Sequence, residues 1–236
     1  MANRVPLALL PGLLLDRALW RAQIEGLADI AECRVADLTT QDSVADMAAD
    51  VLAAMPARFA LASLSMGGYV AFEILRQAPD RVAVLALLDT TARPDTAAQT
   101  ARRRGLIKLA QNGKFKGVTR RLLPMLVHTD RLDDAALTGE VTAMAERIGR
   151  AAFLRQQTAI MARPDSRPLL ARIACPTLVL CGRQDALTPL AWHMEMAAAI
   201  REAHLVVIED CGHLAPLERP AAVTAALRRW LGRNRA

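Results

Sequence analysis

Short runs of apolar residues alternate along the chain with longer stretches in which apolar side chains recur every three or four positions. The continuous runs predict buried strands, and the three-to-four spacing predicts helices that present one apolar face. Strands that alternate with helices are typical of the α/β class, a mostly parallel sheet with helices on both faces. The expected strands are 7–10, 59–64, 82–88, 177–181 and 205–208, and the expected helices are 43–55, 66–77, 189–200 and 220–231.

This alternation stops in residues 93–165, where only helical periodicity is present. Glycine and proline interrupt helices, and three such residues divide the stretch into four expected helices: Gly113, Pro124 and Gly149. We therefore expect an α/β core of residues 1–92 and 166–236, with residues 93–165 inserted between two strands as a helical lid or cap. The alternative is a second packed layer with no gating role.

Composition narrows the class of protein. Hydrophobic residues make up 53% of the chain and charged residues 23%, which indicates a folded domain rather than a disordered one. Aromatic residues make up only 3%, which argues against a surface that stacks on nucleic-acid bases.

The apolar run 5–15 is broken by prolines and a glycine and is too short to span a bilayer. No transmembrane segment is therefore expected, and a cytoplasmic location follows by default.

The four cysteines show neither a C-x-x-C pair nor the spacing of metal ligands, so no metal and no cofactor are expected. Buried free thiols in a reducing compartment are the ordinary interpretation. Cys211 lies two residues before His213. A redox or nucleophilic role is the alternative for this one cysteine.

The stretch Ser63-Leu64-Ser65-Met66-Gly67-Gly68 lies between an expected strand and an expected helix. Serine hydrolases carry the nucleophile on such a tight strand-to-helix turn, usually with the pattern G-x-S-x-G. The residues two before and two after the serine must be small, because strand and helix pass close together there. Gly67 fits this pattern, and the small Ser63 replaces the first glycine. Ser65 is therefore the candidate nucleophile, and a polar residue in an ordinary turn is the alternative.

Two later strands end in the residue types that a serine nucleophile needs as partners. Gly-Arg-Gln-Asp at 182–185 follows one strand, and Gly-His at 212–213 follows the next. Parallel α/β sheets place their active sites at the carboxyl ends of strands. The order Ser, Asp, His therefore predicts a catalytic triad of Ser65, Asp185 and His213.

Competing residues exist for two of these roles. Asp89 also ends an expected strand and is the alternative acid, although a helix cap or a substrate-pocket residue is its more ordinary interpretation. The other three histidines lie in the expected lid, within an expected helix and just before an expected strand, in that order: His128, His193 and His204. His213 is the one that follows a strand end beside a glycine.

Together, a serine, a histidine and an aspartate can make the serine hydroxyl reactive toward a carbonyl group. A serine hydroxyl attacks a carbonyl only when a base takes its proton, which is the role expected for His213. Asp185 would accept from the other imidazole nitrogen and stabilise the imidazolium. The oxyanion of the intermediate needs backbone donors, which we expect to be the N–H groups of Met66, directly after the nucleophile, and of Leu13 in the loop after the first strand.

With these motifs the chain resembles the α/β-hydrolase superfamily over essentially its whole length. Leu-Leu-Pro-Gly at 9–12 resembles the oxyanion loop of the family, which usually reads His-Gly where this chain has Pro11-Gly12. Ser-Met-Gly-Gly at 65–68 resembles its nucleophile turn, and the expected lid lies where the family inserts its cap. The chain is similar to small carboxylesterases, including the pimeloyl-carrier-protein methyl esterases. The resemblance implies hydrolysis of an acyl ester through an acyl-enzyme intermediate.

Other activities share this triad. A thioesterase and a carbon–carbon bond hydrolase remain alternatives, and so does a non-catalytic module that binds a small molecule. The expected partner is a small acyl ester. Net charge is +6, and the excess lies in residues 93–165, where an acidic partner or anionic substrate is the alternative to an ordinary exposed surface. Eight basic residues and no acidic one lie between Thr96 and Thr129: Arg102, Arg103, Arg104, Lys108, Lys114, Lys116, Arg120 and Arg121.

Overall fold

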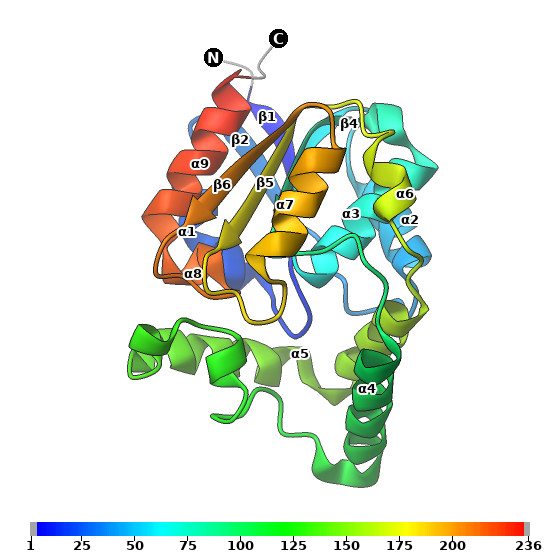
Figure 1. Ribbon diagram of the computed structural model, residues 1–236, viewed down its shortest axis with the longest axis vertical. Coiled ribbons are helices and arrows are strands. Elements are labelled where there is room, and N and C mark those ends of the chain that lie inside the picture. The colour runs from blue at the N-terminus through cyan, green and yellow to red at the C-terminus, as the bar shows by residue number, and fades with distance from the viewer. Residues whose placement is uncertain (1–3, 234–236) are drawn as a thin grey trace.

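The computed structural model describes residues 4–233, and its centre is a sheet of six parallel strands (Figure 1). The spatial order is β2-β1-β3-β4-β5-β6, so the chain first extends the sheet to one side of β1 and then to the other. Such a reversal opens a crevice at the carboxyl ends of the central strands. The strands are β1 (Val5–Leu10), β2 (Ala31–Val35), β3 (Phe59–Leu64), β4 (Val82–Leu88), β5 (Thr177–Gly182) and β6 (Ala203–Ile208).

Both faces of the sheet are buried, because successive side chains of a strand point to opposite faces. Leu7 and Leu9 lie in one apolar cluster with residues of α1 and α9, whereas Ala8 and Leu10 lie in a second cluster with residues of α2, α3 and α7. This confirms the α/β class. The helices of the core are α1 (Arg21–Gly26), α2 (Val44–Ala54), α3 (Met66–Gln77), α6 (Arg167–Leu170), α7 (Leu190–Ala199), α8 (Ala215–Glu218) and α9 (Pro220–Arg233).

Two further helices lie between β4 and β5, α4 (Ala97–Leu109) and α5 (Ala135–Ala162). Figure 1 shows them beyond the end of the sheet to which the arrows of β5 and β6 point. The break expected at Gly149 is confirmed, since its backbone has φ 74° and ψ 178° inside α5. No helix among the residues that the structure describes combines the length and apolar character that crossing a bilayer requires.

The expectation of four helices in residues 93–165 is wrong in its middle part. Between Lys114 and Asp134 the chain forms turns, with three-residue helical turns at Leu123–Met125 and Thr129–Arg131. Gly117 has a φ of 58°, which interrupts helical hydrogen bonding, and Pro124 has no N–H to donate. This part of the chain is therefore held by its contacts with the core rather than by helical propensity.

Sequence reasoning did not identify β2, which lies at one edge of the sheet. Its residues Ala-Glu-Cys-Arg-Val alternate between buried or half-buried and exposed positions. An edge strand has one neighbour and a wetter face, so it lacks the continuous apolar run that marks the central strands. His204 was expected just before a strand and instead lies within β6.

Candidate active site

Ser65 lies in the tight turn between β3 and α3, with φ 53° and ψ −116°. A positive φ is costly for a residue with a side chain, so the packing around the turn must hold it in place. A Cβ on Gly67 would overlap the carbonyl oxygen of Leu10, and a Cβ on Gly68 would overlap the hydroxyl of Thr90. That hydroxyl donates to the carbonyl oxygen of Ser65 at 2.7 Å. The close approach of the Leu10 backbone on one side and of the Thr90 side chain on the other therefore holds the Ser65 turn.

Ser63, which replaces the usual first glycine, is fully buried in β3. Its hydroxyl donates to the carbonyl oxygen of Ala86 at 3.2 Å. A buried hydroxyl is tolerated when it finds an acceptor, and this hydrogen bond explains how serine fits a position at which the pattern has glycine.

The structure brings Ser65, His213 and Asp185 together from three separate loops. His213 Nε2 lies 2.9 Å from Ser65 Oγ, and His213 Nδ1 lies 2.9 Å from Asp185 Oδ2. Asp185 follows β5, and His213 follows β6. The two imidazole nitrogens thus join a hydroxyl to a carboxylate in one hydrogen-bonded chain.

The Asp185 carboxyl is almost fully buried, yet its environment favours the ionised form. Burial opposes ionisation, but the adjacent His213 and the hydrogen bonds from His213 and Thr188 together hold the pKa of Asp185 below its usual value. Oδ1 accepts from the backbone N–H groups of Leu187 and Thr188 at 2.8 and 2.9 Å. The Thr188 hydroxyl donates to Oδ2. Sequence reasoning missed Thr188, although a hydroxyl residue three positions after the acid was visible.

Glu218 orders the loop that carries His213, and sequence reasoning missed it too. Its buried carboxylate accepts from the backbone N–H groups of Gly212 and Leu214, on either side of the histidine, at 3.0 and 3.2 Å. Its other oxygen accepts from the N–H of His128 at 2.7 Å. The N–H of His213 itself donates to the carbonyl oxygen of Leu126 at 3.1 Å. The histidine loop is therefore fastened to the segment between α4 and α5.

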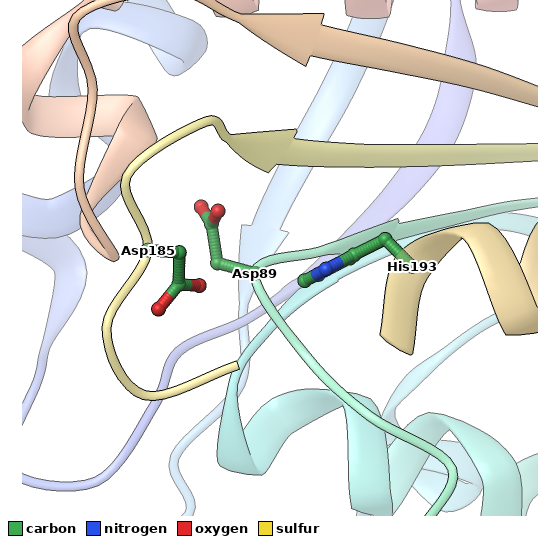
Figure 2. A group of neighbouring side chains, drawn as sticks. All are labelled: Asp89, Asp185 and His193. Atoms are coloured by element: carbon green, nitrogen blue, oxygen red, sulfur yellow. The ribbon is translucent and has the colours of Figure 1, made fainter. Parts of the chain in front are cut away.

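Asp89, the alternative acid, lies beside Asp185 (Figure 2). It is fully buried and does not line the cavity described below, so the pocket interpretation is wrong. Its two oxygens accept from the N–H groups of Gly182 and Ala215 at 2.9 and 3.3 Å. It therefore links the end of β5 to the start of α8 and does not cap the helix that follows it in the chain. Burial, with the charge of Asp185 beside it, raises the pKa of Asp89 well above its usual value.

Asp89, Asp185 and His193 place potential metal-ligating atoms within 4.8 Å of one another (Figure 2). The acceptor atoms of the cluster already have donors. Both oxygens of each carboxylate accept hydrogen bonds, and Nε2 of His193 accepts from the N–H of Thr90 at 3.0 Å. Burial lowers the pKa of His193 to about 4. A cation would have to displace these hydrogen bonds. The three side chains therefore fit a structural role, in which they hold neighbouring backbone segments together, better than a metal centre.

Leu13, one of the two expected oxyanion donors, lies in the loop after β1, and Met66 is the first residue of α3. Within residues 4–233, the N–H groups of Leu13 and Met66 donate to no protein acceptor. The neighbouring Leu14, at φ 59°, donates its N–H to Oε1 of Gln156 in α5 at 3.1 Å, and Nε2 of Gln156 donates to the carbonyl oxygen of Leu38 at 3.1 Å. Gln156 is a third residue that sequence reasoning missed, since nothing local marks it.

A cavity of about 500 Å³ opens onto Ser65 and His213, and Leu13 and Met66 also line it. Most of the rest of its wall comes from residues between β4 and α6. These include several apolar side chains: Leu106, Leu109, Phe115, Leu122, Met125, Leu126, Phe153 and Ile160. An apolar cavity with a few convergent polar groups is the usual form of a small-molecule site.

All four cysteines are free thiols. Cys211 is fully buried, and its burial, followed by the nearby acidic groups, raises its pKa far above the usual range. A thiol that cannot ionise is a poor nucleophile, so Cys211 is a buried free thiol and not a second nucleophile.

Comparison with known proteins agrees with this architecture. The family model described as "Alpha/beta hydrolase family" matches residues 7–227. A protein of Mycobacterium tuberculosis (strain ATCC 25618 / H37Rv), provisionally named a non-heme bromoperoxidase (BpoC), is 32% identical over 200 residues, which cover 81% of this chain and 75% of that protein. A pimeloyl-[acyl-carrier protein] methyl ester esterase of Chromobacterium violaceum is 29% identical over 178 residues, or 72% of this chain and 68% of that one.

The solved structures show the same relationship. A thermophilic esterase from Thermogutta terrifontis, determined with malate bound, superposes with a TM-score of 0.90 at 32% identity, over 99% of this chain and 92% of that one. A match of this extent covers the sheet, its helices and the segment between β4 and β5. With its parallel six-stranded sheet and the strand-to-helix turn at Ser65, the chain therefore belongs to the α/β hydrolase family.

Proposed function

We propose that this hydrolase cleaves a small carboxylic ester, with Ser65 as nucleophile, His213 as base and Asp185 as the acid that orients it. The observation that carries the proposal is the hydrogen-bonded chain from Ser65 Oγ through both nitrogens of His213 to Asp185, with 2.9 Å at each step, at the wall of the cavity. A serine, a base and an orienting carboxylate in this geometry are what nucleophilic acyl transfer requires.

Ser65 Oγ would attack the carbonyl carbon of the ester while its proton moves to His213 Nε2. Negative charge then develops on the carbonyl oxygen, and the uncommitted N–H groups of Leu13 and Met66 would donate to it. Each donor of this kind is worth about 3–4 kcal/mol of transition-state stabilisation. The lowered pKa of Asp185 keeps that carboxylate charged beside the imidazolium.

Collapse of this intermediate would break the bond to the alcohol oxygen, which takes the proton from His213 and leaves the acyl group on Ser65. Water then attacks the acyl-enzyme as His213 removes its proton, and a second collapse returns the proton to Ser65 and releases the acid. The similarity to two esterases favours an ester over a thioester or a carbon–carbon bond as the substrate.

We also propose that residues 93–165 form a lid over this site. They supply most of the cavity wall outside the immediate surroundings of the triad. Their hydrogen bonds to the loops of Leu14 and His213 would couple the position of the lid to the reacting groups.

The proposal is tested with p-nitrophenyl esters of increasing chain length. We expect wild-type turnover to fall by roughly 10³-fold or more in Ser65→Ala, because the residual rate would come from binding and the oxyanion donors alone. Ser63→Ala is the matched control: its hydroxyl contacts Ala86 and not His213, so activity should remain. A serine-directed covalent inhibitor should label Ser65. Labelling of Ser63, or full activity in Ser65→Ala, would overturn the assignment.

A further inference from the structure

The cavity above Ser65 is lined by many cations and few anions. Seven of its lining residues are lysine or arginine, and Asp95 is the acidic one among those that the structure describes. Five of the cations come from residues 102–121, the stretch that the sequence marks as lacking any acid between Thr96 and Thr129: Arg102, Arg103, Lys114, Lys116 and Arg121.

Little of this charge is neutralised by the protein. Oδ1 of Asp95 accepts from Arg163 at 2.8 Å, and Oδ2 accepts from Arg103 at 2.7 Å, so one carboxylate is shared between two guanidinium groups. Arg93 pairs with Glu195. The side chains of the other four cations on the cavity wall form no ion pair or hydrogen bond with any residue in the described part of the chain: Arg102, Lys114, Lys116 and Arg121.

The side chain of Arg103 is more buried than these exposed cations and is held by hydrogen bonds. Its side chain is 22% exposed, its Nε donates to Asp95, and its Nη1 donates to Oε1 of the buried Gln157 at 2.9 Å. Two partners therefore hold the guanidinium in one orientation at the cavity wall. Its remaining nitrogen, Nη2, donates to no acceptor within residues 4–233. A guanidinium held in this way loses little entropy when it binds an anion.

We propose that Arg103 is the anchor of an anion subsite, and that the substrate is an ester whose acyl chain ends in a carboxylate. This inference rests on the proposed esterase function. The ester end would lie at Ser65, and the free carboxylate would accept from Nη2 of Arg103, with the unpaired cations around it raising the local positive potential. The apolar side chains on the cavity wall suit the methylene chain of such a half-ester.

A small molecule fits these observations better than an acidic protein. Arg103 is largely buried and lines the same cavity as Ser65, and the partners that hold it, Asp95 and Gln157, line that cavity as well. A docking surface for a protein would instead place its charges on an outward face. Three of the eight basic residues of the stretch do lie outside the cavity wall and do not enter the proposal: Arg104, Lys108 and Arg120.

The test compares monomethyl adipate with dimethyl adipate, which present the same acyl chain and differ by one negative charge. We expect wild-type enzyme to favour the monomethyl ester in kcat/KM by at least tenfold, the effect of one charge-assisted hydrogen bond. Arg103→Gln should reduce this ratio toward one. Arg104→Gln, which removes the same charge from the next residue of α4 outside the cavity, should leave the ratio at its wild-type value.

A second variant covers the chance that the loss of the Asp95 pairing disturbs folding in Arg103→Gln. Arg102→Gln with Lys116→Gln removes two unpaired cations, and we expect it to lower the ratio at low salt but not at high salt, where exposed charges are screened. A wild-type ratio near one would overturn the inference and leave the esterase proposal standing. Equal losses in Arg103→Gln and Arg104→Gln would also overturn it. Hydrolysis of neither ester, nor of any p-nitrophenyl ester, would refute the proposed function itself.

Discussion

The exchange of Asp185 for asparagine tests the proposed acid with almost no change of shape. Oδ1 of Asp185 accepts from two backbone N–H groups, so the amide oxygen of asparagine takes that position and the NH₂ group faces Nδ1 of His213. An NH₂ group can only donate there, which forces the imidazole proton onto Nε2. In this tautomer Nε2 cannot accept the proton of Ser65.

The expected loss in kcat is roughly 10⁴-fold, which corresponds to about 5 kcal/mol at the transition state. The assay is steady-state hydrolysis of a p-nitrophenyl ester, with urea unfolding as the measure of stability. Asp89→Asn is the matched control, because Asp89 is a second buried carboxyl group beside Asp185 that does not line the cavity. The asparagine amide has one acceptor oxygen in place of two, so one of the N–H groups of Gly182 and Ala215 loses its acceptor. We expect a loss of about 1–3 kcal/mol in stability and less than a tenfold loss in rate. The reverse ranking in activity would move the catalytic acid to Asp89.

Three further predictions concern the support of the site. Gln156→Leu removes the acceptor of the Leu14 N–H and should lower kcat at least tenfold by releasing the oxyanion loop, with little change in KM; an unchanged kcat would contradict this. The pKa of His193 is about 4 in the folded chain and about 6.5 when unfolded, so the unfolded state binds the extra proton as pH falls between these values. Stability should drop by on the order of 3 kcal/mol across that window, and His193→Gln should flatten the slope measured by urea unfolding at each pH. Gly67→Ala should reduce soluble, active protein, because its methyl group meets the backbone of Leu10; normal activity would refute this.

Sequence periodicity alone predicted most of the core with close boundaries. The strand at 59–64, the helix at 66–77 and the strand at 82–88 match β3, α3 and β4 to the residue. Their signal is strong because these elements are buried on both faces or along a continuous stripe, so burial dictates the residue type at nearly every position. The edge strand β2 and the turns between Lys114 and Asp134 escaped prediction because solvent contact and tertiary packing, rather than local pattern, define them.

Local sequence also marked Ser65, Asp185 and His213, because each follows a strand end and the carboxyl ends of parallel strands meet at one edge of a sheet. Their catalytic roles and the division into core and lid remain predictions. Only the tertiary structure showed which groups hold these residues: Thr188 on Asp185, Glu218 around His213, and Gln156 on the loop of Leu14.

Only the tertiary structure likewise showed which basic side chains line the cavity. The sequence by itself determined that residues 102–121 are basic, but not which of those side chains turn inward. Folding places Arg103 against Asp95 and Gln157 at the cavity wall and leaves Arg104, its neighbour in the same helix, outside it. The physical reason is that adjacent residues of a helix project about 100° apart, so the packing of that helix, and not its composition, selects the residue that faces the site.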